Sequence, residues 1–223
     1  MIHLGSIFGT TIRVDLSFLI VVGLWVASAY DPQQGIQYAL LWAPVLFISV
    51  LVHELAHAAM IGIFGYGSSE IVLGGIGGVT MNRRQARPWQ DVLISLAGPV
   101  SSVGLSFLVR LLYVSVPFAR RDPMFAVLLP MLIEMNIWWA IFNLLPISPL
   151  DGGQAVRNFL RMFLRDRLAF AIAVWIAIIV GVGVVILSIA FLKSIFLAAL
   201  ISWYVFMNYQ SWQYYREHGT PGD

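Results

Sequence analysis

Two histidines four residues apart, with a glutamate directly after the first, form the part of this chain best suited to chemistry. The sequence there reads His53-Glu54-Leu55-Ala56-His57. On an α-helix, residues four apart lie about 40° apart around the axis and roughly 6 Å apart along it, so both imidazoles can bind one metal ion. Glu54 points away from that line and can act as a general base on water at the metal. The pattern predicts metal-assisted hydrolysis.

The motif lies in a membrane-compatible stretch. Residues 39–64 are long enough to cross a bilayer, and His53, Glu54 and His57 are their only ionisable residues. An ionisable side chain at bilayer depth is costly, so its presence there indicates a functional site. The alternative interpretation is two core histidines with satisfied hydrogen bonds.

A catalytic zinc takes three protein ligands and leaves one position for water, so one ligand must come from elsewhere in the chain. Position 63 is Ile63, which excludes the metzincin pattern with its third histidine. Asp91 stands near the start of an apolar span, where a carboxylate stabilises the helix dipole. Glu70 falls in a loop, and Glu134 lies in the middle of a span and is a serious rival. Asp151 has the strongest context.

Asp151 follows a segment that cannot continue as a regular helix. Residues 143–153 contain two prolines and two glycines around it. Irregular backbone at membrane depth is tolerated only against protein or a water-filled cavity, and hydrolysis within a bilayer needs such a cavity. Clusters of prolines, glycines and aspartate are more often plain turns. Because the motif lacks a third metal ligand, however, we favour Asp151 for that role.

Composition indicates a polytopic membrane protein. The 223 residues are 60% hydrophobic and 11% charged, whereas soluble domains carry about 25% charged residues. We expect one integral-membrane domain over residues 1–223, without a separate soluble domain. The net charge of +2 indicates membrane orientation and no nucleic-acid binding. Cysteine is absent, so a metal site must use nitrogen and oxygen ligands.

Hydropathy predicts an all-α fold with about six transmembrane helices. Lysine and arginine residues concentrate in the segments on one side, which predicts that both termini are cytoplasmic. Ala27-Ser28-Ala29 resembles a signal-peptidase site, but the preceding region has little positive charge, so we expect the first span to be retained. The predicted spans are residues 16–30, 39–64, 89–116, 124–145, 168–192 and 194–209.

Two connecting segments have patterns of their own. Residues 70–81 predict two short β segments around glycines, as a hairpin or small sheet between spans two and three, with a flexible glycine-rich loop as the alternative. Residues 158–167 predict a basic amphipathic helix lying on the inner leaflet.

The motifs together resemble the site-2 protease family of intramembrane zinc metalloproteases, in a compact form without PDZ or CBS domains. The resemblance covers roughly residues 5–165. Many relatives have asparagine at Ser102 and histidine at Asp15, positions that we expect to lie away from the ligands and to bear on subgroup. The motifs that carry the resemblance are His53-Glu54-Leu55-Ala56-His57, Ser95-Leu96-Ala97-Gly98-Pro99, Phe142-Asn143-Leu144-Leu145-Pro146 and Leu150-Asp151-Gly152-Gly153.

The resemblance implies a chemistry and a site. One Zn²⁺ would be held by His53, His57 and Asp151, with Glu54 as general base and Asn143 as a polar residue that orients substrate or stabilises the oxyanion. It also implies a small β-sheet near the site.

The implied function is regulated intramembrane proteolysis in a membrane, which we expect to be a prokaryotic cell membrane. The substrate would be a transmembrane protein cut within or near its membrane segment, chosen through the bilayer, short loops or a separate regulatory partner. Two other classes remain. A zinc transporter or sensor should show repeated halves, and the sequence has none; an inactive scaffold would not need Glu54.

Overall fold

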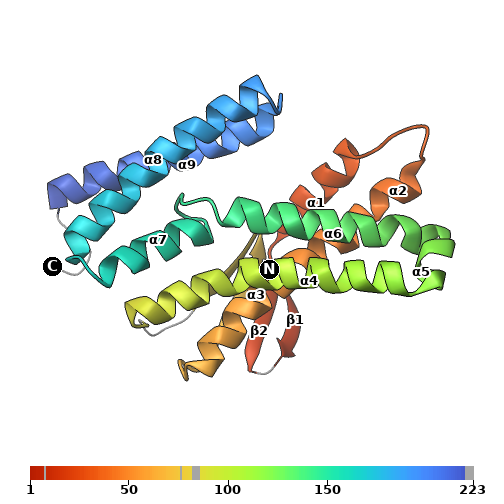
Figure 1. Ribbon diagram of the computed structural model, residues 1–223, viewed down its shortest axis with the longest axis horizontal. Coiled ribbons are helices and arrows are strands. Elements are labelled where there is room, and N and C mark those ends of the chain that lie inside the picture. The colour runs from red at the N-terminus through yellow and green to blue at the C-terminus, as the bar shows by residue number, and fades with distance from the viewer. Residues whose placement is uncertain (8, 76, 82–85, 219–223) are drawn as a thin grey trace. The chain divides into compact units, whose positions relative to one another are not determined.

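The His-Glu-His motif lies in a helix of a mostly helical structure (Figure 1). This computed structural model describes residues 1–7, 9–75, 77–81 and 86–218. The described residues form two compact units, Met1–Gln85 with Ala97–Ile141 and Ala86–Leu96 with Phe142–Asp223, each considered by itself. The helices are α1 (Leu16–Ser28), α2 (Ile36–Leu40), α3 (Trp42–Ile63), α4 (Pro88–Ser115), α5 (Pro117–Arg121), α6 (Pro123–Asn143), α7 (Asp151–Arg161), α8 (Asp166–Ala190) and α9 (Ile195–His218).

Among the residues that the structure describes, four helical segments are long and apolar enough to cross a membrane. They are Ile36–Ile63, Pro88–Ser115, Pro123–Asn143 and Asp166–Ala190. The first predicted span contains α1, whose 13 residues cover only about 20 Å of a core roughly 30 Å thick. The last contains α9, where amide and aromatic side chains lower the hydropathy. Integral-membrane character is therefore supported, and the count of six spans stays a prediction, as does the single domain.

A four-stranded sheet accompanies the helices of the first unit. Its order is β1-β2-β3-β4, with β1/β2 and β3/β4 antiparallel and β2/β3 parallel. The two β segments predicted within residues 70–81 are confirmed as β3 and β4, whereas the pair before residue 15 was not predicted. The strands are β1 (Ile2–Ile7), β2 (Thr10–Val14), β3 (Glu70–Gly74) and β4 (Gly77–Met81).

Alternate residues of the two central strands attach the sheet to the motif helix. Ile12 and Val14 of β2 share one buried cluster with Ile71 and Leu73 of β3. Val50 of α3 belongs to the same cluster, so an apolar face of the sheet packs on the helix that carries the histidines. This packing brings β4, the neighbour of β3, to the side of the motif.

The second unit contains the helical hairpin of α8 and α9, which lie side by side (Figure 1). Its core includes Ile147 and Leu150, just before α7, and Ala177 and Ile201 from the hairpin. The helix predicted over residues 158–167 was placed too late in the chain. It begins at Asp151, because the irregular segment is already complete at Leu150, and it ends at Arg161 before a turn leads into α8.

Candidate metal centre

Helix α3 buries all three ionisable residues of the motif. His53, Glu54 and His57 are 2%, 4% and 6% exposed, although they lie in an apolar candidate span. The two imidazole rings have centroids 4.9 Å apart in an edge-to-face arrangement. The prediction that spacing by four puts both rings on one side of a helix is therefore confirmed.

Gly98 of α4 faces both histidines at very close range. A Cβ atom built on Gly98 would collide with Nε2 of His53 and Nε2 of His57. The two Nε2 atoms therefore converge on one point of the α4 backbone, and only a glycine leaves room there for the rings. This close approach gives the glycine of the Ala97-Gly98-Pro99 sequence a physical reason.

Ser102, one turn beyond Gly98, orients His53. Its hydroxyl is fully buried and lies 3.1 Å from Nδ1 of His53. A hydrogen bond at Nδ1 fixes the ring and leaves Nε2 for a metal, as outer partners of metal-binding histidines generally do. The expectation that position 102 lies away from the ligands was wrong, because α4 crosses α3 at this level. The sequence did contain a clue to this contact, because Ser102 lies four residues after Gly98 and so on the same side of the helix.

Glu54 is held on a different side of α3, by the sheet. Thr80 Oγ1 of β4 lies 2.7 Å from Glu54 Oε2 and donates to it, and the same hydroxyl lies 3.2 Å from the Glu54 backbone oxygen. A Cβ atom at Gly78 would collide with the Glu54 side chain. The strand thus covers the carboxylate and points one donor at it. Sequence patterns did not identify Thr80, because its contact lies 26 positions away.

Asp15, the other position that departs from the family pattern, stabilises the start of helix α1. It caps α1, and the hydroxyl and backbone N–H of Ser17 donate to Oδ1 at 2.6 and 3.0 Å. These hydrogen bonds lower the pKa of Asp15 below its usual value, and the bond from the Ser17 hydroxyl has the largest effect. Ser17 Oγ also accepts from the backbone N–H of Gly75, which ties the start of α1 to the end of β3.

In the second unit, Asp151 is the first residue of α7 and follows the break after α6. Asn143 is the last residue of α6. Cβ atoms at Gly152 and Gly153 would collide with the backbone of residues 144–148. The two glycines therefore allow the first turn of α7 to pack directly on the irregular segment, which fixes the backbone that carries Asp151.

Within the described part of the chain, His53, His57 and Asp151 form a group that could hold a metal ion. Two imidazoles and one carboxylate are the donor set that suits a catalytic zinc. The rival carboxylates fall outside this group. Glu70 pairs with Arg13 at 2.9 Å, Asp91 lies in the first turn of α4, and Glu134 is exposed on α6.

Comparison with known proteins identifies the family. A profile of the peptidase M50B-like family matches residues 16–150, more than half of the chain, and a profile of peptidase family M50 matches residues 121–190. The chain belongs to the M50B-like peptidase family. The resemblance to site-2 proteases is thus confirmed, and the matched residues include the His-Glu-His motif, Gly98 and Asn143.

Several M50-type relatives can be named. "Putative zinc metalloprotease sll0528" of Synechocystis sp. is 30% identical over 93% of this chain and 58% of its own length. "Putative zinc metalloprotease Rip3" of Mycobacterium tuberculosis is 33% identical over 71% of this chain and 43% of its own length. The chain thus spans about half the length of these relatives. The solved site-2 protease of Methanocaldococcus jannaschii shares the fold, with TM-score 0.64 at 24% identity over 94% of both chains.

Gly98 provides a test of the M50B-like site that leaves every candidate ligand in place. We expect Gly98→Ala to lower the affinity for zinc at least about tenfold, because the added methyl group displaces the two Nε2 atoms. Gly104→Ala in the same helix is the control, since a Cβ atom there meets nothing within 4 Å. The measurement is a zinc titration of both purified variants. Equal affinities would contradict the close approach of Gly98.

Proposed function

We propose that this chain is an intramembrane zinc metalloprotease that cleaves a membrane protein within or near a transmembrane segment. The observation that carries the proposal is the burial of His53, Glu54 and His57 in an apolar helix long enough to cross a bilayer, with both Nε2 atoms directed at one point. Buried ionisable groups at such a depth mark a functional site. Membership of a peptidase family supports hydrolysis of peptide bonds as the reaction.

In this proposal His53, His57 and Asp151 are the residues that would hold one zinc ion. When bound, zinc lowers the pKa of a water molecule and polarises the scissile carbonyl. Ser102 keeps the His53 ring turned so that Nε2 is available. Asn143, at the end of α6, orients the substrate or donates to the oxyanion that develops on the scissile carbonyl.

Glu54 performs the proton transfers. Its carboxylate takes a proton from the attacking water and delivers it to the leaving amine, which is general base and then general acid catalysis. Thr80 donates to Oε2 at 2.7 Å and so holds the carboxylate in one orientation.

The proposed substrate is a transmembrane helix that unwinds locally before it is cut. A helix hides each carbonyl in its own hydrogen bonds, so the scissile peptide must first become extended. Strand β4 lies at the edge of the sheet and contacts Glu54 through Thr80. An extended segment can add to such an edge through backbone hydrogen bonds. We propose that the reaction takes place in a prokaryotic cell membrane and that both termini are cytoplasmic. A separate partner protein would regulate it.

The test is cleavage of a single-span membrane substrate by the purified protein in liposomes. We expect a discrete product that disappears with a chelator and returns with added zinc. Gly or Pro near the scissile bond removes roughly 1–3 kcal/mol of substrate helix stability. Cleavage should then rise about tenfold for each ~1.4 kcal/mol taken from the barrier. Proline where the paired strand donates its N–H should instead block cleavage.

Three outcomes would count against this function. Cleavage that persists in the chelator would exclude a zinc reaction. Rates that ignore helix-breaking residues at every position would exclude unwinding as the limiting step. Failure to cut any of a panel of single-span substrates, with zinc bound, would contradict intramembrane proteolysis.

A further inference from the structure

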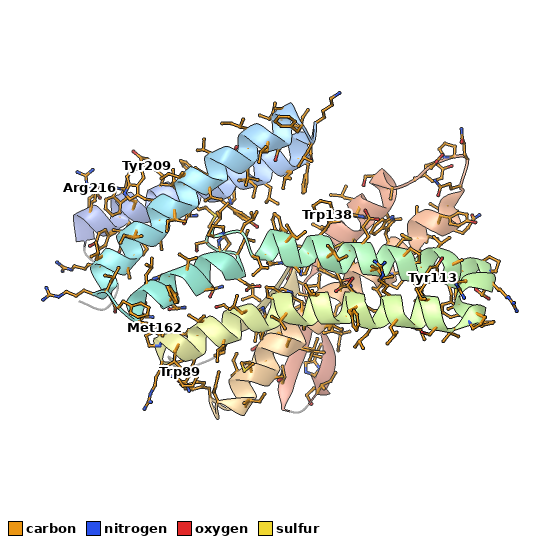
Figure 2. The ribbon with its side chains drawn as sticks, viewed as in Figure 1. Trp89, Tyr113, Trp138, Met162, Tyr209 and Arg216 are labelled. Carbon is orange, nitrogen blue, oxygen red and sulfur yellow. The ribbon has the colours of Figure 1, made fainter. Side chains whose placement is uncertain are left out.

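An open groove runs between α4 and α6 of the first unit. Its volume is about 520 Å³, and aromatic and charged side chains of both helices line it. Tyr113 of α4 and Trp138 of α6, both labelled in Figure 2, are among them. Arg110 and Glu134 bring opposite charges into the same groove. Neither belongs to the metal-capable group, so the groove needs an explanation of its own.

The two charges stand exposed on helices that are apolar enough to cross a membrane. Arg110 lies on α4 and Glu134 on α6, and both side chains are exposed. Among the residues that the structure describes, neither side chain takes part in an ion pair or hydrogen bond. A charge that faces hydrocarbon is costly, and such residues normally pair with another charge or face protein. An occupant with both opposite charges would remove this cost.

Contacts between the helices set the depth of each charge. The Ser106 hydroxyl donates to the backbone oxygen of Ile133 at 3.2 Å, and α4 and α6 run antiparallel through the short connection at α5. By this register Arg110 lies near the level of residue 129, roughly 7 Å along the axis from Glu134. Helical side chains lean toward their own N-terminus, so Arg110 and Glu134 lean toward each other's level.

The length and depth of the groove favour a protein surface within the membrane as its partner, and not a lipid headgroup. By the same register, Tyr113 and Trp138 lie roughly 18 Å apart along the helix axes, or about three helical turns. Glu134 lies roughly 16 Å along the axis from the first residue of α6, near its middle. A lipid headgroup stays at the membrane interface and does not reach that depth.

We propose that this groove is the interface of a homodimer within the membrane, in which Arg110 of each copy pairs with Glu134 of the other. The surface carries one charge of each sign, so it is complementary to itself. A twofold axis along the membrane normal keeps every residue at its own depth in both copies. Two symmetric ion pairs then form together, and charges of this kind set the register and specificity of an interface.

Charge swaps test the pairing. Arg110→Glu or Glu134→Arg alone places like charges across the interface and should raise the dimer dissociation constant at least about tenfold. The double swap should return it to within about threefold of the parent, because the pair is restored. The measurement is the dimer fraction in liposomes over a range of protein-to-lipid ratios, by single-molecule photobleaching. Arg121→Glu, on α5 outside the groove, is the control and should change nothing.

Crosslinking gives a readout that does not need the swapped variants to fold. The chain has no cysteine, so Val114→Cys or Ile137→Cys in the groove can report on contact without background. One of them should form disulfide-linked dimers under mild oxidation, whereas exposed Val182→Cys on α8 should not. A monomeric parent at every ratio, or single swaps that dimerise like the parent, would overturn the proposal. The groove would then hold a lipid or another protein, or Arg110 and Glu134 would pair within one chain.

Discussion

Replacing Glu54 with glutamine should abolish peptide-bond hydrolysis while the fold and the zinc content stay unchanged. The amide keeps the size of the side chain and can still accept from Thr80, whose hydroxyl bonds Glu54 Oε2 in the parent. It cannot take a proton from water, and general base catalysis contributes typically 10²–10⁴-fold. We expect activity to fall by at least about a hundredfold. The measurement is initial cleavage rate per zinc-loaded enzyme.

The control for this substitution is Glu217→Gln near the end of α9, where the glutamate is exposed. That variant should retain the parent rate, which excludes a general effect of lost negative charge. Turnover of the Glu54→Gln enzyme within about tenfold of the parent would remove Glu54 from the role of general base. Loss of zinc together with activity would assign it a part in holding the metal instead.

Asp151→Ala should release the zinc, and Glu134→Ala should not. Loss of an outer-shell partner alone typically costs 10–100-fold in metal affinity, so loss of one of three ligands should leave roughly a tenth of the zinc or less after dialysis. His53→Ala and His57→Ala should behave like Asp151→Ala. Zinc content is measured by elemental analysis of the purified variants alongside the parent.

The pair of carboxylates makes this experiment decisive. Glu134 was a serious rival in the sequence. In the structure it is exposed in the α4/α6 groove and lies outside the group that could hold a metal ion. Full zinc in Asp151→Ala together with loss in Glu134→Ala would show that the third ligand has been misassigned. Loss in both variants would indicate a fold that depends on each residue separately.

The motif helix could be predicted because its information is local. Spacing by four within one helix brings His53 and His57 together whatever the rest of the fold does. The same holds for the break before Asp151, where prolines and glycines stop any regular helix. Strands β3 and β4 follow each other directly, so a short alternating pattern around glycines was enough to predict them.

The features that the sequence did not predict depend on contacts between segments far apart in the chain. The N-terminal hairpin was not predicted, because β2 is stabilised by a parallel pairing in which Thr11 meets Glu70. No local pattern announces that partner. For the same reason Ser102 was wrongly expected to lie away from the ligands and Thr80 was not identified, since each reaches the motif from another element. The first and last predicted spans are not among the candidate spans of the described residues, because α1 has only 13 residues and α9 mixes amide side chains with apolar ones.

The hydrogen bond between Thr80 and Glu54 has a kinetic consequence. The strand proposed to receive the substrate and the carboxylate proposed to move the proton are joined at 2.7 Å, so they form one mechanical unit. A poorly seated substrate that shifts β4 also turns the carboxylate away from its working direction. If the proposed function holds, we therefore expect substrate binding and turnover to depend on the same contact. Poor substrates should then show a lower kcat as well as a higher KM. Their poor fit to β4 would slow proton transfer by Glu54 as well as weaken binding.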